Sequence, residues 1–550
     1  MYKATALDKQ ILAFEKKVSP LGMFASGLKQ YAGKVWLPTK ENERKALAEV
    51  DRLLKKAKND IVAKKYLRAV RRGLLFEELH DYPSTVMNYF YEHFLIEGFV
   101  QKHINSIADG CLKILDIKKH LLKKDWPAEI KLLTVLACDG CIGVLATARQ
   151  NINGPRVREK LDLIATKIKE WRAAAAVGRI RKGDFSEVFP LLKKHGKGFR
   201  REKFYPRLLK DFYDYPETAK DIEAKALSWL DAELPKFKAI VAKLASKLDC
   251  KPIPDAVEKV MDKKFAVPRK RLVQTILSMR KILQRVAELH WVQITPKYDV
   301  RVIETPKYLV PFMPTAAMSS FNTLTSKPFC VFFATTDPRG SPSTCLPELM
   351  QTIIHEEYGH CVNFMNSYKG LLKPLRLVEI LGSTLDTPIT EGLSFHREIE
   401  ALQTFRHFEH EEHLGKEDRA LVQLMERYAD LETFTDCLEY VVRKWRVFRF
   451  LRAISDSRVN TGKQRYAGFV DWAAKKTGLP RKLIYDQTFF FQERPGYSPG
   501  YSMFGQQLAE LQKKAFAKGI PRLDFNTFVA STGFPARKLF ERQIKQHFRL

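Results

Sequence analysis

Apolar residues recur at the spacing of a helix through most of the first 290 residues. Prolines and glycines interrupt this pattern, and the stretches between them are roughly 12–25 residues long, which is typical of helices joined by short connections. The longest apolar run, residues 132–148, contains Asp139 and is shorter than the ~20 apolar residues of a membrane-spanning helix. We therefore expect a buried helix there and no membrane association.

The pattern changes after residue 294. Residues 300–304, 308–311 and 329–336 are rich in β-branched and aromatic side chains, which favours strands. They predict a small sheet immediately before the next helical stretch. Residues 329–334 are our candidate for an edge strand, where an extended peptide could add to the sheet through backbone hydrogen bonds. An ordinary core strand is the alternative.

Residues 347–370 (PELMQTIIHEEYGHCVNFMNSYKG) return to helical spacing and carry His355, Glu356 and His360. Two histidines four residues apart can share a zinc ion from one helical face, but here the spacing is five. In a regular α-helix the two rings would diverge by about 140°. The spacing suits a shared metal only if a π-bulge absorbs one residue, and we expect that distortion at Gly359.

A third metal ligand is available in residues 390–400 (TEGLSFHREIE), where Glu391 opens another helical pattern. Catalytic zinc sites have about three protein ligands and keep one position open, whereas structural sites have four. His355, His360 and Glu391 therefore predict one catalytic Zn²⁺ per chain, with Glu356 as the general base for water. The other interpretation is a helix whose two histidines make only ordinary hydrogen bonds. Alternative third ligands in the same stretch are Glu398 and Glu400.

These motifs carry a family resemblance. HEEYGH followed by EGLSFHRE resembles the zinc metallopeptidase-like family catalogued as domain of unknown function 885, whose signature is HExxPGHH followed by EGWALYxE. The five-residue spacing also resembles the HExxxH of dipeptidyl peptidase III, a gluzincin. Residues 452–460 (RAISDSRVN) are similar to the family's RxxxDxxxH, and residues 495–501 (PGYSPGY) to its PGQAxxY. The resemblance extends from about residue 200 to the C-terminus and is faint before it.

The chain departs from the family at several motif positions. It lacks the proline and second histidine of PGHH, and it has Asn460 in place of a histidine, Tyr497 in place of a glutamine and His396 in place of a tyrosine. The loss of the doubled histidine leaves His360 as the second ligand. Asn460 cannot transfer a proton as a histidine would.

The resemblance implies a mostly α, large helical metallopeptidase-like fold, with a small β-sheet inserted before the zinc-site helix and a substrate cleft between two helical lobes. Residues 1–200 would form an N-terminal helical region and residues 201–550 the catalytic region of one two-lobed unit. Tyr501 is our candidate donor to the oxyanion of the reaction. The candidate substrate-binding residues are Arg458, Arg494, Tyr497, Asn460 and His396, with the arginines suited to a carboxylate.

The net charge of +31 is the main compositional anomaly. It favours acidic partners, although the basic residues are spread over helical patterns without a nucleic-acid-binding motif. The cysteines are scattered, and Cys138 and Cys141 form a lone CxxC that we interpret as buried thiols. With no secretory leader pattern at the N-terminus, we expect a cytoplasmic protein. His407, His410 and His413 lie among acidic residues, which favours a solvated helix end over a metal site.

The function that the sequence predicts is a zinc-dependent hydrolase of peptide or related amide bonds, acting on substrates that could be acidic. Two alternatives stay open. One is a basic helical binding protein for nucleic acid or another polyanion, with a vestigial or structural metal site. The other is a metal-dependent hydrolase of a small non-peptide amide, which would differ from a peptidase in the size of its pocket.

Overall fold

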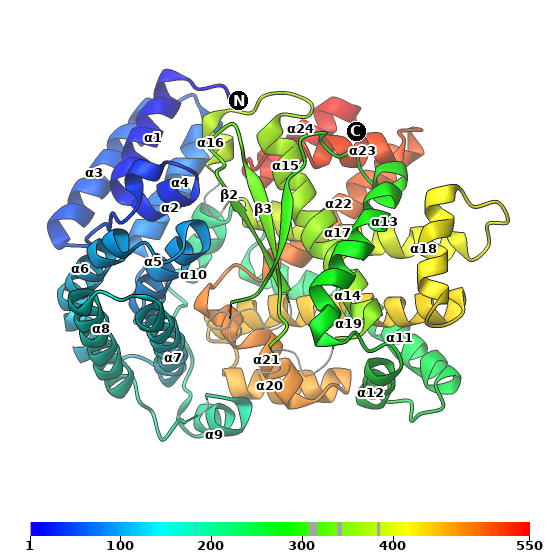
Figure 1. Ribbon diagram of the computed structural model, residues 1–550, viewed down its shortest axis with the longest axis horizontal. Coiled ribbons are helices and arrows are strands. Elements are labelled where there is room, and N and C mark those ends of the chain that lie inside the picture. Colours follow the sequence, from blue (N-terminus) through cyan, green and yellow to red (C-terminus); the bar gives the residue numbers. More distant parts are fainter. Residues whose placement is uncertain (1, 182, 307–315, 338–343, 382–384) are drawn as a thin grey trace.

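The computed structural model describes residues 2–181, 183–306, 316–337, 344–381 and 385–550. Helices fill the first 290 residues as the apolar pattern predicts, and in Figure 1 the blue to teal helices form one side of the molecule. Threonine caps begin several of them. Thr218, for example, accepts a hydrogen bond from the Asp221 N–H, and the Asp221 side chain accepts one from the Thr218 N–H.

The helices of this half are α1 Ala6–Val18, α2 Pro20–Ala25, α3 Lys40–Lys56, α4 Ile61–Leu75, α5 Asp81–Glu97, α6 Gln101–Lys118, α7 Ala128–Asn151, α8 Pro155–Ala174, α9 Phe185–His195, α10 Tyr205–Arg207, α11 Ala219–Lys247, α12 Pro254–Lys264 and α13 Leu272–His290. Short turns are η1 Lys29–Tyr31, η2 Lys119–Lys123, η3 Leu208–Phe212, η4 Arg269–Arg271 and, later in the chain, η6 Phe490–Glu493.

The second half holds a three-stranded sheet followed by more helices. The strands are β1 Val300–Glu304, β2 Ala316–Phe321 and β3 Phe329–Ala334. The helical segments are α14 Leu346–Ile353, η5 Ile354–Cys361, α15 Val362–Lys369, α16 Leu377–Ile380, α17 Thr387–Phe408, α18 Lys416–Glu426, α19 Leu431–Asn460, α20 Tyr466–Thr477, α21 Arg481–Thr488, α22 Pro499–Ala517, α23 Arg522–Val529 and α24 Arg537–Phe548. The fold is therefore mostly α with a small sheet before the histidine-bearing helix, as expected.

The longest apolar run forms α7, which packs against α5 and α8. By length and composition α7 could cross a membrane, but 61% of its most apolar window is buried inside the protein. The largest buried cluster of apolar side chains includes α7 and extends from Leu79 to Ala530. It therefore draws on both of the regions, 1–200 and 201–550, that the sequence distinguishes.

The strand order in the sheet is β1-β3-β2, with β1 parallel and β2 antiparallel to β3. The prediction that residues 329–334 form an edge strand is therefore wrong, because β3 is the central strand. Its sequence FCVFFA is buried at five of six positions, as expected of a strand covered on both faces. The edge strand β2 was missed because AAMSSF has no β-branched residue. The predicted strand at 308–311 lies outside the described residues.

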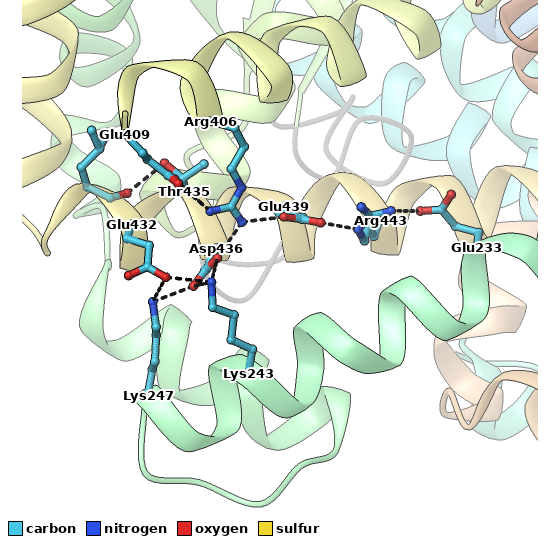
Figure 2. A network of polar contacts seen from close by, with 11 residues as sticks. Glu233, Lys243, Lys247, Arg406, Glu409, Glu432, Thr435, Asp436, Glu439 and Arg443 are labelled. Atoms are coloured by element: carbon cyan, nitrogen blue, oxygen red, sulfur yellow. Dashed lines mark hydrogen bonds and ion pairs between the residues drawn. The ribbon is translucent and has the colours of Figure 1, made fainter. Parts of the chain in front are cut away.

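Charged side chains fix α17 and α19 to α11 (Figure 2). Asp436 of α19 is fully buried and accepts hydrogen bonds from Lys243 and Lys247 of α11, each at 2.8 Å. It also accepts one from Arg406 of α17 at 2.6 Å, and Arg406 pairs in addition with Glu439. Because three cations surround one buried carboxylate, the network holds α17, which carries part of the site described next, against α19 and α11.

Candidate metal centre

The helix that carries the two histidines contains a π-helical turn. The turn η5 spans Ile354–Cys361 between the α-helical segments α14 and α15, and Gly370 ends the helix in a left-handed conformation. A π-turn bonds residue i to residue i+5, so residues five apart lie above one another. The ring centroids of His355 and His360 are 4.9 Å apart, with the rings nearly perpendicular. The predicted π distortion is confirmed, and it brings the two imidazoles to one side of the helix.

Gly359 allows α17 to lie against this turn. A Cβ atom at position 359 would come within 2.5 Å of the Ser394 Cα, closer than side chains approach a backbone. Glycine is therefore required here by the close contact between two helices, since its own φ is not in the left-handed region. This contact is what brings Glu391 of α17 to the histidines of η5.

We predict that Gly359→Ala lowers the melting temperature and the metal content together, because α17 must move away from the π-turn. Overpacking of this kind costs about 1–3 kcal/mol of folding free energy. Gly143→Ala in α7 is the matched control, since a Cβ there meets nothing within 4 Å, and a helical Gly→Ala change should stabilise by up to about 1 kcal/mol. Thermal unfolding and metal analysis of both variants check this, and a Gly359→Ala protein with unchanged metal content would contradict it.

The carboxylate of Glu391 completes a group of three candidate ligands. Its Oε2 lies 3.5 Å from the Nε2 of His360 and 3.7 Å from the Nε2 of His355. The three side chains are buried, and one ligand atom from each lies within 4.8 Å of the others. Glu391 Oε2 is enclosed and has no hydrogen-bond partner among the described residues. A buried carboxylate oxygen without a donor is costly, and a cation between these atoms would satisfy it.

The electrostatics of the three groups also favour a cation. Burial opposes ionisation of Glu391, but the two histidines outweigh it and hold the pKa of the carboxyl well below its usual range. Burial and Arg449 both lower the pKa of His355, yet Glu391 and Glu398 raise it to about 9. Two imidazoles and one carboxylate are a donor set that zinc accepts. The residues present therefore fit the predicted metal.

Glu398 orients His355 from behind. Its Oε1 accepts a hydrogen bond from the His355 Nδ1 at 2.7 Å and one from Gln351 at 2.7 Å, and Arg449 pairs with its other oxygen. In this tautomer the Nε2 of His355 is free to bind a metal. Glu398 is therefore an outer partner of the candidate ligand His355. Glu400 faces elsewhere, since its carboxylate accepts hydrogen bonds from Arg397, Gln512 and Asn526.

The two glutamates after His355 face different surroundings. Burial raises the pKa of Glu356, and the charges of His355 and His360 oppose that shift. Glu357 is fully buried on another side, where it pairs with Arg280 and accepts a hydrogen bond from the Tyr298 hydroxyl at 3.2 Å. The Arg280 and Tyr298 contacts occupy Glu357, so of the two glutamates Glu356 stays the candidate base.

Two tyrosines reach the site, Tyr497 from the loop before α22 and Tyr501 from the first turn of α22. The hydroxyl of Tyr497 donates a hydrogen bond to Glu391 Oε1. The ring of Tyr501 stacks on His355 at a centroid distance of 6.3 Å. Burial and the charge of Glu391 raise the pKa of Tyr501, so its phenol keeps a proton at neutral pH. The loop is anchored by Asp456, which accepts a hydrogen bond from the Gly496 N–H at 2.9 Å.

Several predicted substrate-binding residues lie away from the metal ligands. Asn460 is fully buried, donates to Asp456 and accepts from Arg201, so it has a structural role. Arg458 pairs with Glu223 at 2.7 Å and stacks on Trp472. Arg494 is exposed, and its charge acts on Tyr213 and Glu493.

His396 lies on the opposite face of α17 from Glu391. Its Nε2 is 3.6 Å from Glu400, and its ring lines a cavity of about 740 Å³ between α11, α17, α19 and α22. In a regular helix residues five apart diverge by about 140°, which explains the position. His396 therefore does not contact the candidate metal ligands, and its role in substrate binding stays a prediction. In the same way seven residues make about two turns, so Glu398 returns to the face of Glu391.

The sequence interpretation missed two arginines of α19, Arg449 and Arg452. Arg449 lies 5.4 Å and Arg452 5.5 Å from the ring centroid of Tyr501. Arg452 is part of the RxxxDxxxN stretch that carried the family resemblance, and a spacing of three residues puts both arginines on one helical face. This three-residue spacing was the feature of the sequence from which both arginines could have been found.

The histidine-rich segment and the CxxC motif, which the sequence raised as further candidates, have ordinary roles. His407, His410 and His413 are exposed around the end of α17, and His407 pairs with Glu411. Cys138 and Cys141 are buried in α7, where burial raises the pKa of both thiols, so the interpretation as buried thiols is confirmed.

No protein-family model and no curated protein matches the sequence. Solved structures are similar along the whole chain. A putative lipoprotein from Colwellia psychrerythraea superposes with a TM-score of 0.65 at 13% identity, over 99% of this chain and 98% of that one. A putative lipoprotein of unknown function from Shewanella oneidensis has a TM-score of 0.65 at 16% identity, over 98% of this chain and 100% of that one. At these identities the likeness shows a shared fold.

Proposed function

We propose that this protein is a zinc-dependent hydrolase of peptide or related amide bonds. The observation that carries the proposal is the buried Glu391 Oε2, which has no hydrogen-bond donor among the described residues and lies within 3.7 Å of two histidine Nε2 atoms. A purely structural site would have no use for Glu356 beside these ligands. Hydrolysis of a mixed peptide library that stops with a chelator and returns with zinc tests the proposal. Metal-independent hydrolysis, or none, would overturn it.

His355, His360 and Glu391 would hold the ion, and zinc at such a site supplies a Lewis acid that polarises a carbonyl and makes water more acidic. Glu356 takes the proton from the attacking water, for which its raised pKa suits it, and passes it to the leaving amine. Tyr501 donates its phenolic proton in a hydrogen bond to the oxyanion that develops on the substrate carbonyl. Tyr497 holds Glu391 through its other oxygen.

The position of the sheet favours a peptide over a small amide. The edge strand β2 contacts the π-turn η5, which carries two of the candidate ligands, so an edge of the sheet lies next to that turn. An extended substrate can bind such an edge through main-chain hydrogen bonds. We therefore assign to β2 the role that the sequence suggested for residues 329–334.

We further propose a cytoplasmic location and acidic substrates. All eight cysteines are free thiols, and seven of them are buried, as is usual in reducing compartments. The two similar structures are described as putative lipoproteins, which predicts the competing location outside the cytoplasm. Fractionation of the native cells decides between the two.

The net charge of +31 should steer acidic peptides to the site. We predict that kcat/KM for acidic peptides falls as salt rises from ~10 mM to ~150 mM, because the Debye length shrinks from ~30 Å to ~8 Å. Neutral peptides of equal length are the control. If RNA or DNA instead binds with a steep salt dependence while peptide turnover is unchanged, the charge serves nucleic-acid binding.

A further inference from the structure

Arg452 is a buried arginine without a carboxylate partner in the described part of the chain. It is 5% exposed, and it donates from Nε and Nη2 to the backbone and side-chain oxygens of Gln487, at 2.9 and 2.5 Å. Its guanidinium lies over the Phe491 ring at 3.8 Å. Every other buried arginine that the structure describes pairs with a carboxylate: Arg201 with Glu78, Arg397 with Glu400, Arg446 with Glu233, Arg449 with Glu398 and Arg537 with Glu217.

An unpaired buried cation is costly because it has lost water and gained no opposite charge. Burial lowers the pKa of Arg452 to about 10, and the negative charges that oppose this do not restore its usual value. The Nη1 group has no hydrogen-bond partner among the described residues and is not sealed from solvent. One side of the guanidinium fork is therefore available to a ligand.

Arg452 lies beside the candidate metal site. Its guanidinium carbon is 5.5 Å from the ring centroid of Tyr501, whose ring stacks on His355. The nearby Arg449 is already neutralised by Glu398. Arg452 is thus the buried positive charge next to Tyr501 that still lacks a counterion.

We propose that Arg452 binds a carboxylate of the substrate, with the free C-terminal carboxylate of a short peptide as the favoured source. This inference rests on the proposed function in placing the peptide at the metal site. A carboxylate supplies the counterion that Arg452 lacks and accepts N–H groups from its planar fork. Gln487 and Phe491 fix the guanidinium, so little side-chain entropy is lost when the ligand binds. The same chemistry is available from an Asp or Glu side chain.

Binding of hippurate and of its neutral amide, hippuramide, tests the inference without any need for turnover. Calorimetry on the full-length protein should show hippurate binding more tightly than hippuramide. Arg452→Met should weaken hippurate binding by about 10- to 100-fold, the usual effect of losing a hydrogen bond to a charged group, and leave hippuramide unchanged. Arg465→Met, which removes an exposed charge at the start of α20, is the control and should behave as wild type.

Equal binding of the two compounds by the wild type would overturn the inference, and so would unchanged hippurate binding by a folded Arg452→Met protein. If Arg452→Met does not fold, Arg452→Lys keeps the charge but loses the planar fork, and it should weaken hippurate binding by less than about 10-fold. An unchanged affinity in that variant would count against the inference.

Peptide turnover then identifies the source of the carboxylate. Peptides with a free C-terminus are compared with C-terminally amidated ones, and Glu-containing peptides with their Gln counterparts. A preference that follows the free C-terminus and disappears in Arg452→Met supports the favoured source. A preference for Glu-containing over Gln-containing peptides would identify an acidic side chain as the carboxylate that binds Arg452. If hippurate binds through Arg452 but no peptide is hydrolysed, the proposed function is wrong and the inference about Arg452 is kept. If peptides are hydrolysed at the same rate with and without either carboxylate, the proposed function is kept and the inference about Arg452 is wrong.

Discussion

Glu356→Gln should abolish hydrolysis while leaving the metal content and the melting temperature as in the wild type. The amide keeps the shape of the side chain but cannot accept a proton from water. General-base catalysis contributes about 10²–10⁴-fold to rate, so kcat should fall by that factor. Steady-state kinetics on a peptide substrate, with zinc measured in the same sample, check the result. Undiminished turnover would remove Glu356 from the mechanism.

Glu357→Gln is the matched control one residue away. Glu357 is fully buried and bonded to Arg280 and Tyr298, so its loss leaves a mostly buried arginine without its counterion. The cost is about 1–3 kcal/mol of stability. We therefore expect a lower melting temperature with turnover largely retained, which is the opposite of the Glu356→Gln result. A stable but inactive Glu357→Gln protein would mean that the two roles are assigned the wrong way round.

His355→Ala, His360→Ala and Glu391→Ala should each lose zinc, because removal of one of three ligands leaves two side chains to hold the ion. Loss of an outer partner of a ligand typically costs 10–100-fold in metal affinity. We expect that smaller loss from Glu398→Gln, which keeps a hydrogen-bonding side chain behind His355. The three ligand variants should lose more than this. Competition with a chromogenic chelator ranks all four proteins.

Full zinc occupancy in Glu391→Ala would exclude Glu391 as the third ligand. A Glu398→Gln protein that binds zinc as weakly as His355→Ala would make Glu398 part of the inner set. Since Glu398 bonds the Nδ1 of His355, that outcome would also require the ring to bind the metal through the other nitrogen.

The local features of the site could be predicted from the sequence. A five-residue spacing between His355 and His360 is compatible with a shared ion only in a π-turn, and η5 is such a turn. Gly359 was the expected place for the distortion, although its closest constraint is the contact with Ser394 of α17. These features depend on spacing along one helix, which is written directly in the sequence.

Features that depend on contacts between helices could not be predicted in the same way. Arg458 pairs with Glu223 of α11, and Asn460 accepts a hydrogen bond from Arg201. Both partners lie more than 200 residues earlier in the chain. Arg452 differs from Arg449 only in what packs against it. Helical geometry alone would nevertheless have predicted which of Glu398 and His396 shares a helical face with Glu391. Glu398 is seven residues after Glu391, about two turns, and lies on the same face, whereas His396 is five residues after it and does not.

The sheet could be predicted from the sequence only in part. Strand propensity found β1 and β3, whose residues are mostly β-branched or aromatic, but not β2, whose residues are mostly small. The central strand β3 is the one that pairs with a neighbour along both of its edges. The burial of β3 was visible in its continuous apolar sequence, and that signal should have favoured a central position.

The most direct test of the central claim is a titration of the metal-free protein with zinc while peptide hydrolysis is followed in the same cuvette. We predict that turnover rises in proportion to added zinc and stops rising at one zinc per chain, and that Glu356→Gln binds the same single zinc without turnover. Zinc that binds stoichiometrically to the wild type without producing hydrolysis of any peptide in the library, or hydrolysis that is complete before zinc is added, would contradict the account.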